Sequence, residues 1–146
     1  MRIEEVNPEH LDAWSRLRAE LWPESSIEYH RAELTQLLSN ENAIAYLACG
    51  QAGDVVGFAE ATLRHDYVNG CETSPVLFLE GIYVLPGHRR QGVARSLCKA
   101  VAAWGRAAGC REFGSDALLD NVESHAFHIA SGFEETERVV YFRKSL

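Results

Sequence analysis

Residues 81–94 read Gly-Ile-Tyr-Val-Leu-Pro-Gly-His-Arg-Arg-Gln-Gly-Val-Ala, and this stretch leads from an apolar strand into a helix. The strand is predicted to end before Pro86, because proline has no amide N–H to continue the pairing. A helix is predicted over 92–108, where apolar residues recur on one face. The free N–H groups of its first turn, together with Arg89 and Arg90, suit a pyrophosphate. The stretch therefore indicates an anion site, although an ordinary helix entry can have the same composition.

The elements around this stretch predict a single α+β domain spanning residues 1–146. Helices are expected after Asn7-Pro8 and after the capping-box pattern Ser25-x-x-Glu28, and strands over 43–49, 55–63, 76–84, 111–115 and 139–143, with a further helix over 121–130. We expect Leu11, Trp14, Leu17 and Leu21 to face inward from the first helix, and Ile27, Leu34, Leu37 and Leu38 from the second. This order of elements fits a sheet with mixed strand directions, and the chain shows no repeat or linker.

Composition excludes several classes of protein. Hydrophobic residues make up 47% of the chain and charged residues 24%, which is the balance of a globular protein rather than a disordered one. No run approaches the roughly 18 apolar residues of a membrane span, and the first residues lack the order of a signal peptide, so we expect a cytoplasmic protein without membrane contact. The four cysteines have no metal-type spacing, so neither a metal site nor a disulfide framework is expected. Cys49 and Cys98 lie in apolar stretches and are predicted to be packed thiols rather than nucleophiles.

Charge is distributed unevenly along the chain. Residues 1–80 carry a net charge of −9, residues 81–111 a net charge of +6 with no acidic residue, and residues 112–146 a net charge of −4. A basic segment inside an acidic protein suits a small polyanionic ligand, although a solvated helix face explains the count equally well. The acidic remainder would repel nucleic acid and attract cations, so no nucleic-acid partner is expected.

The pattern Arg89-x-x-Gly92-x-Ala94 after Gly81-Ile82-Tyr83-Val84 resembles the coenzyme A signature of the GNAT superfamily of N-acetyltransferases. Asn121 and the pair Gly132-Phe133 resemble that superfamily's second motif. The resemblance implies a mixed sheet with a splayed cleft flanked by helices, and acetyl-CoA as co-substrate without a metal. It implies that backbone N–H groups of Ile82, Tyr83 and Val84 hold the pantetheine, that those of Gln91, Gly92, Val93 and Ala94 meet the pyrophosphate with charge from Arg89 and Arg90, and that Asn121 contacts the pantetheine arm.

Nearly the whole chain also resembles one branch of that superfamily, the aminoglycoside 6'-N-acetyltransferases of bacterial antibiotic resistance. The segments that carry this resemblance are 21–23, 64–71, 74–76, 78–82, 115–116 and 132–138. It implies a homodimer that acetylates the 6'-amino group of a cationic aminoglycoside by direct attack of the amine on the thioester. It also places Trp22, Tyr67 and Glu137 around the sugar rings. Trp22 could instead be a core residue, and Asp66 next to Tyr67 could serve only the turn.

Three side chains are candidates for the chemistry. Acetylation needs a neutral amine, a polarised carbonyl and a proton for the leaving thiolate. Glu80 and Asp116, both expected at strand ends, could hold the ammonium group and accept its proton. The alternatives are an edge-strand charge or an N-cap for Glu80 and a helix N-cap for Asp116. His128 stands where many members of the superfamily have a tyrosine that protonates the thiolate, and it could donate that proton or be a structural histidine.

Two other functions remain open from the sequence. The acceptor could be a polyamine or a protein amine, since the acidic surface suits both. A non-catalytic acyl-CoA sensor is the third hypothesis, and the acidic pair Glu80 and Asp116 argues against it.

Overall fold

A mixed five-stranded sheet forms the centre of the protein in the computed structural model, which describes all of residues 1–146. The strands are β1 (Arg2–Glu5), β2 (Ala43–Cys49), β3 (Val55–Arg64), β4 (Val76–Val84) and β5 (Phe113–Ser115), and they lie in that order. The first four are antiparallel, whereas β5 runs parallel to β4. The predicted α+β fold with mixed strand directions is therefore confirmed. The short strand β1 was not expected, because Glu4 and Glu5 interrupt its apolar pattern.

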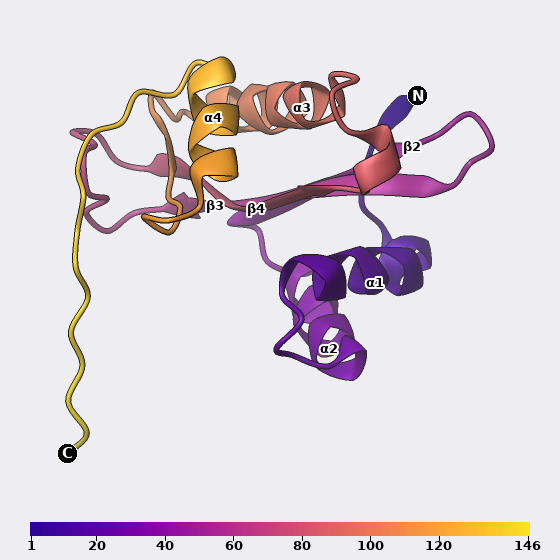
Figure 1. The fold of residues 1–146 in the computed structure, drawn as a ribbon, viewed down its shortest axis with the longest axis horizontal. Coiled ribbons are helices and arrows are strands. Elements are labelled where there is room, and N and C mark those ends of the chain that lie inside the picture. The colour runs from indigo at the N-terminus through magenta and orange to yellow at the C-terminus, as the bar shows by residue number, and fades with distance from the viewer.

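Helices cover both faces of the sheet (Figure 1). The helices α1 (Leu11–Leu21) and α2 (Ile27–Leu37) lie on one face, and α3 (Val93–Ala107) and α4 (Val122–Ala130) lie on the other. Single 3-10 turns, η1 (Pro8–His10) and η2 (Pro86–His88), precede α1 and α3. None of the four helices combines the length and apolar character that crossing a bilayer requires.

Each face has its own apolar core. Under α1 and α2 the buried cluster comprises Leu11, Trp14, Leu17, Leu34, Ala45, Leu47, Cys49 and Phe58. Under α3 the cluster includes Val56, Leu77, Leu97, Cys98 and Val101. The predicted stripes on α1 and α3 thus face inward. Because the two cores are separated by one sheet, both faces of β3 and β4 are buried, which explains why these strands are apolar along most of their length.

The second helix begins one residue later than its sequence pattern suggests. Ser26, not Ser25, is the N-cap of α2, and its hydroxyl accepts a hydrogen bond from the Tyr29 N–H at 3.1 Å. Ile27 is then the first helical residue and lies 48% exposed instead of facing inward. Leu34 is fully buried as expected, and Leu37 and Leu38 pack against the same core.

The predicted strand over 139–143 does not form. After α4 the chain has no regular structure, and it runs away from the sheet to the C-terminus (Figure 1). Val140, Tyr141 and Phe142 are 77%, 81% and 92% exposed. A strand needs a hydrogen-bonded neighbour, and this segment pairs with no edge of the sheet, so its alternating apolar pattern alone does not make it a strand.

The two cysteines that lie in apolar stretches pack inside the protein, as predicted. Cys49 and Cys98 are buried, and burial raises the pKa of the Cys98 thiol to about 11. A thiol with so high a pKa carries little thiolate at neutral pH, so Cys98 is a packing residue and not a nucleophile.

Candidate active site

The start of α3 is shaped to receive an anion. Gly92 has φ of 80° in the left-handed region, and a side chain there would meet nothing within 4 Å. No side chain caps the first turn of α3, so its first N–H groups are free for a ligand. Arg90 and Gln91 stand exposed beside this entrance, whereas the side chain of Val93 is buried and offers only its backbone.

The Arg89 side chain folds back and contacts the end of the preceding strand. Its Nε donates a hydrogen bond to the Val84 carbonyl at 2.8 Å, and its guanidinium carbon lies 5.4 Å from the centre of the Tyr83 ring. Only the terminal nitrogens of Arg89 are therefore free for a phosphate. The same hydrogen bond also holds the loop between β4 and α3 against the end of β4.

The strand β4 is irregular where the chemistry is expected. Glu60 pairs with Gly81, and the next residue of β3, Ala61, pairs with Leu79, so Glu80 forms a bulge. The pairing of β4 with β5 ends at Leu79. From Gly81 to Val84 the strand is paired with β3 alone, and its other edge is open. The backbone of Ile82, Tyr83 and Val84, predicted to hold the pantetheine, lies on this open edge.

Glu80 is held in an ion pair on the α1–α2 face. Its Oε1 accepts hydrogen bonds from the Thr62 hydroxyl at 2.7 Å and from Arg64 Nε at 3.1 Å, and both of its oxygens lie 2.9 Å from Arg64 Nη2. The Arg64 guanidinium also lies over the Phe78 ring, 3.5 Å from its centre. Glu80 lies inside β4 and so is not a helix N-cap, but the pairing with β5 ends at Leu79, so the alternative of an edge-strand charge stays open. Thr62 and Arg64 together orient its carboxylate.

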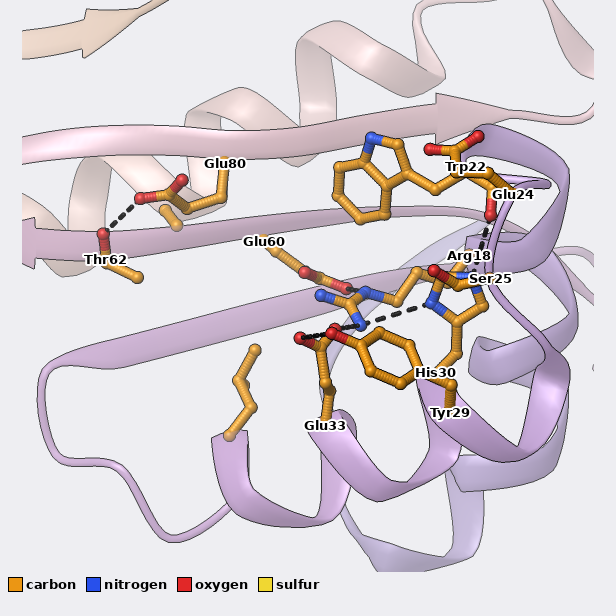
Figure 2. A pocket seen from close by; sticks show the side chains of 12 residues that line it. Arg18, Trp22, Glu24, Ser25, Tyr29, His30, Glu33, Glu60, Thr62 and Glu80 are labelled. Carbon is orange, nitrogen blue, oxygen red and sulfur yellow. Dashed lines mark hydrogen bonds and ion pairs between the residues drawn. The ribbon is translucent and has the colours of Figure 1, made fainter. Parts of the chain in front are cut away.

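A cavity of about 380 Å³ adjoins Glu80 (Figure 2). Its lining residues come from the two N-terminal helices, from the loop between them and from β3 and β4; they are Arg18, Trp22, Glu24, Ser25, Tyr29, His30, Glu33, Leu37, Glu60, Ala61, Thr62 and Glu80. Four of these residues are carboxylates and one is a guanidinium, so the cavity attracts cations. Trp22 is half-buried and lines the cavity, as a wall residue would.

Asp116 and His128 lie around the end of β5. Asp116 follows β5, is exposed, and is not the N-cap of α4, because Asn121 takes that place with its Oδ1 accepting from the Ser124 N–H at 3.2 Å. The His128 Nδ1 lies 2.6 Å from the Ser124 carbonyl, which can only accept a hydrogen bond. Nδ1 therefore carries a proton, and in the neutral ring Nε2 accepts from the Ser115 hydroxyl, 2.7 Å away. His128 thus reaches the strand end through Ser115.

The other two predicted wall residues lie apart from the first cavity. Tyr67 is 76% exposed and lines a second cavity of about 540 Å³ in the 65–74 loop. Glu112 anchors this loop, since its Oε1 accepts from the backbone N–H groups of Glu72 and Thr73 at 2.9 and 2.7 Å. Glu137 lies on the irregular tail after α4. Neither Glu137 nor Asp116 lines either of the two cavities.

Sequence reasoning missed the cluster that backs the first cavity. Glu60 is 2% exposed, and its Oε1 accepts from the Trp14 indole N–H at 3.0 Å and lies 3.0 Å from Arg18 Nε. Burial raises the pKa of Glu60 to about 7, against the opposing effect of Arg18. The sequence did contain a signal for this cluster. A glutamate in the middle of an apolar strand and an arginine on the buried stripe of α1 are both charges in the interior, and a buried charge requires a partner of opposite sign.

Comparison with known proteins decides the family. The family model described as acetyltransferase (GNAT) family matches residues 11–133. The chain belongs to the GNAT family of acetyltransferases. The GNAT signature Arg89-x-x-Gly92-x-Ala94 coincides with the uncapped start of α3, and the open edge of β4 leads directly into it.

Within the GNAT family the chain is similar over its full length to one group of proteins. It is 53% identical to an aminoglycoside N(6')-acetyltransferase type 1 of Stenotrophomonas maltophilia, over 99% of this chain and 93% of the relative. The crystal structure of the 6'-N-acetyltransferase AAC(6')-IG from Acinetobacter haemolyticus is similar with a TM-score of 0.95 and 48% identity, over 100% of this chain and 99% of that one. The structure of AAC(6')-Iy with a bisubstrate analogue, CoA-S-monomethyl-acetylneamine, matches with a TM-score of 0.95 and 46% identity, over 99% and 98% of the two chains.

Proposed function

We propose that this protein is an acetyl-CoA-dependent aminoglycoside 6'-N-acetyltransferase. The observation that carries the proposal is the position of Glu80, which forms the bulge of β4, one residue before the open edge of that strand, and lines a cation-attracting cavity. A carboxylate beside the amine site and free backbone groups beside the thioester site are what amine acetylation requires. The full-length similarity to 6'-N-acetyltransferases selects the aminoglycoside as acceptor.

On the donor side, the pyrophosphate of acetyl-CoA binds at the start of α3, where Gly92 leaves space and Arg90 adds charge. The pantetheine arm lies along the open edge of β4, where Ile82 and the Val84 N–H have no partner in β5, whereas the Val84 carbonyl accepts from Arg89. A backbone N–H on this edge polarises the thioester carbonyl. Asn121 caps α4 with its Oδ1 and keeps its amide nitrogen for the pantetheine.

On the acceptor side, Glu80 holds the amine through Oε2. Oε1 already accepts from Thr62 and from two nitrogens of Arg64, whereas Oε2 has only one contact with Arg64. Each carboxylate oxygen offers about two acceptor positions, so Oε2 has room for an ammonium group. Asp116, exposed after β5, accepts a second hydrogen bond or the proton itself through water.

The reaction moves one proton at each end. The amine nitrogen attacks the thioester carbonyl carbon and gives up a proton to Glu80, Asp116 or water. The carbon–sulfur bond breaks, and the CoA sulfur receives a proton. Ser115 could pass this proton from His128: when both ring nitrogens are protonated, Nε2–H donates to the Ser115 oxygen, and the serine hydroxyl proton goes to the sulfur as Ser115 takes the proton from Nε2. In this proposal His128 acts on the leaving thiolate through Ser115.

An acceptor panel tests this function. Acetyl-CoA is incubated with aminoglycosides, spermidine and a lysine peptide, and free thiol is measured. We expect thiol release with aminoglycosides that have a 6'-amine, and none with a matched aminoglycoside that has a 6'-hydroxyl. Turnover of spermidine or the peptide alone would favour the alternative of a polyamine or protein amine, and binding of acetyl-CoA without any thiol release would favour a sensor.

We further propose a cytoplasmic homodimer. The exposed apolar residues of the tail, Val140, Tyr141 and Phe142, have no cover within one chain, and a second copy is the partner that the cell always supplies. Four free thiols are consistent with a reducing compartment. Light scattering should give the mass of a dimer for the full chain and a smaller mass after truncation at Arg138, and a monomer in the first case would contradict the proposal.

A further inference from the structure

Arg18 is the centre of a polar cluster in the wall of the first cavity, which is the proposed acceptor site (Figure 2). Its side chain is 12% exposed and contacts three titratable side chains from two other elements. Its Nε lies 3.0 Å from Glu60 of β3, and its Nη1 donates to Glu33 and lies 3.4 Å from Nδ1 of His30, both on α2. The guanidinium thus meets Glu33 by a hydrogen bond and Glu60 by an ion pair, in which the Nε–H group lacks hydrogen-bond geometry.

The same cluster holds Trp22 at two points. The Arg18 guanidinium lies over the indole, 4.9 Å from the ring centre. The Trp22 carbonyl accepts a hydrogen bond from Nε2 of His30 at 2.9 Å, which places the imidazole proton on Nε2 and leaves Nδ1 to accept from Arg18. Both the ring and the backbone of Trp22 therefore depend on the orientation of Arg18.

The far edge of the indole is equally constrained. A methyl group on Gly81 would clash with the Cη2 and Cζ2 atoms of Trp22, so the ring lies directly against the backbone of β4. Gly81 is the residue after Glu80, and it begins the open edge of the strand. Trp22 thus connects the buried cluster to the part of β4 where the two substrates are expected to meet.

Stability alone does not explain this cluster. Glu60 is almost fully buried, and removing a carboxylate and a guanidinium from water costs much of what their attraction returns. Apolar side chains of similar volume would pack between α1 and β3 at lower cost. Such apolar side chains could not place a cation over one face of the Trp22 indole. They also could not orient His30, which donates a hydrogen bond to the Trp22 carbonyl.

We propose that Arg18 is a positioning residue of the acceptor site: held by Glu60 and Glu33, it fixes the Trp22 indole against Gly81 as the wall on which the acceptor's sugar ring packs beside Glu80. The inference rests on the proposed function. A fixed indole binds the apolar face of a sugar ring without losing rotamer freedom at the moment of binding. In this role Arg18 acts through Trp22 and not by its own contact with the substrate.

The test is a double-mutant cycle in steady-state kinetics. Arg18→Lys keeps the charge but cannot contact Glu60, Glu33 and His30 together. We expect the KM for the aminoglycoside to rise about tenfold, with kcat and the KM for acetyl-CoA nearly unchanged. In a Trp22→Ala background the same change should have no further effect, because Arg18 acts through Trp22. Arg31→Lys is the matched control: Arg31 pairs with Asp12 and so also joins α2 to α1, but on the exposed side away from Trp22.

Two further measurements keep the inference open to refutation. If Arg18→Lys folds poorly in a thermal melt, Glu33→Gln weakens the same support from a more exposed position and should raise the same KM less strongly. If the wild-type enzyme is active but both variants keep its KM for the aminoglycoside, the role of Arg18 is refuted while the proposed function stands. Additive effects of Arg18→Lys and Trp22→Ala refute the same role. A wild-type protein that releases no thiol with any aminoglycoside overturns the proposed function, and this inference with it.

Discussion

Replacing Glu80 by glutamine tests the assignment of the acceptor site most directly. Glutamine keeps the size of the side chain and one carbonyl oxygen for the Thr62 hydroxyl, but it removes the negative charge. The fold should tolerate the change, because Arg64 is 42% exposed and Glu80 30%, and ion pairs of this exposure are worth about 0–1 kcal/mol. Arg64 also keeps its contact with Phe78. The expected damage is therefore to the bound amine and not to the protein.

The size of the loss follows from the contact that disappears. Oε2 is the oxygen with room for an ammonium group, and losing a charged hydrogen-bond partner in a partly desolvated cavity costs about 2–4 kcal/mol. This corresponds to a fall of about 30- to 1000-fold in kcat/KM for the aminoglycoside. The affinity for acetyl-CoA should hardly change, since the start of α3 lies on the other face of the sheet.

The assay follows free thiol while one substrate is varied and the other is kept saturating. Glu28→Gln, an exposed change in the first turn of α2 outside the cavity, is the control. Asp116→Asn should also lower kcat/KM for the amine, and raising the pH should restore rate in whichever variant has lost the base, because the amine is then already neutral. Unchanged amine kinetics in Glu80→Gln would refute the reasoning and leave Glu80 as a partner of Arg64 only.

Three other outcomes are expected. Gly92→Asp should weaken acetyl-CoA binding in calorimetry far more than Gly92→Asn, since both replace a glycine at φ of 80° but only aspartate brings a negative charge to the pyrophosphate; equal losses would mean that backbone strain is responsible. Gly105→Ala should lower the Tm, because the new methyl group would lie 2.6 Å from Cδ2 of buried Leu77, and overpacking of about 1–3 kcal/mol exceeds the roughly 1 kcal/mol gained in helix propensity; a higher Tm would contradict this. The pKa of Glu60 is raised to about 7 by burial, so the folded state keeps a proton that the unfolded state loses near pH 4.5, and the free energy of unfolding should fall as the pH rises from about 4.5 to about 7. Denaturant titrations should show a flatter dependence on pH in Glu60→Gln, and parallel curves would place the carboxylate in its charged form throughout.

The sequence by itself determined the elements and the family. Local signals were enough for β2 and β4, whose bounds were predicted to the residue, and for the helix entrance at Gly92, because strand periodicity, proline and glycine act within a few residues. Local signals also misplaced the start of α2 and predicted a strand over 139–143, where a pattern was present but no hydrogen-bonded neighbour was.

Only the tertiary structure decided which side chains work together. Arg18, His30 and Glu60 come from three elements, and nothing local predicts that they meet behind Trp22. The ion pair of Glu80 with Arg64 depends on the register of β3 against β4, including the bulge that turns Glu80 toward Thr62. Likewise, the hydrogen bond from Ser115 to His128 exists only because α4 packs beside the end of β5. Local patterns record how a segment folds, whereas a site depends on long-range contacts, and these are fixed only when the sheet and both helical layers have assembled.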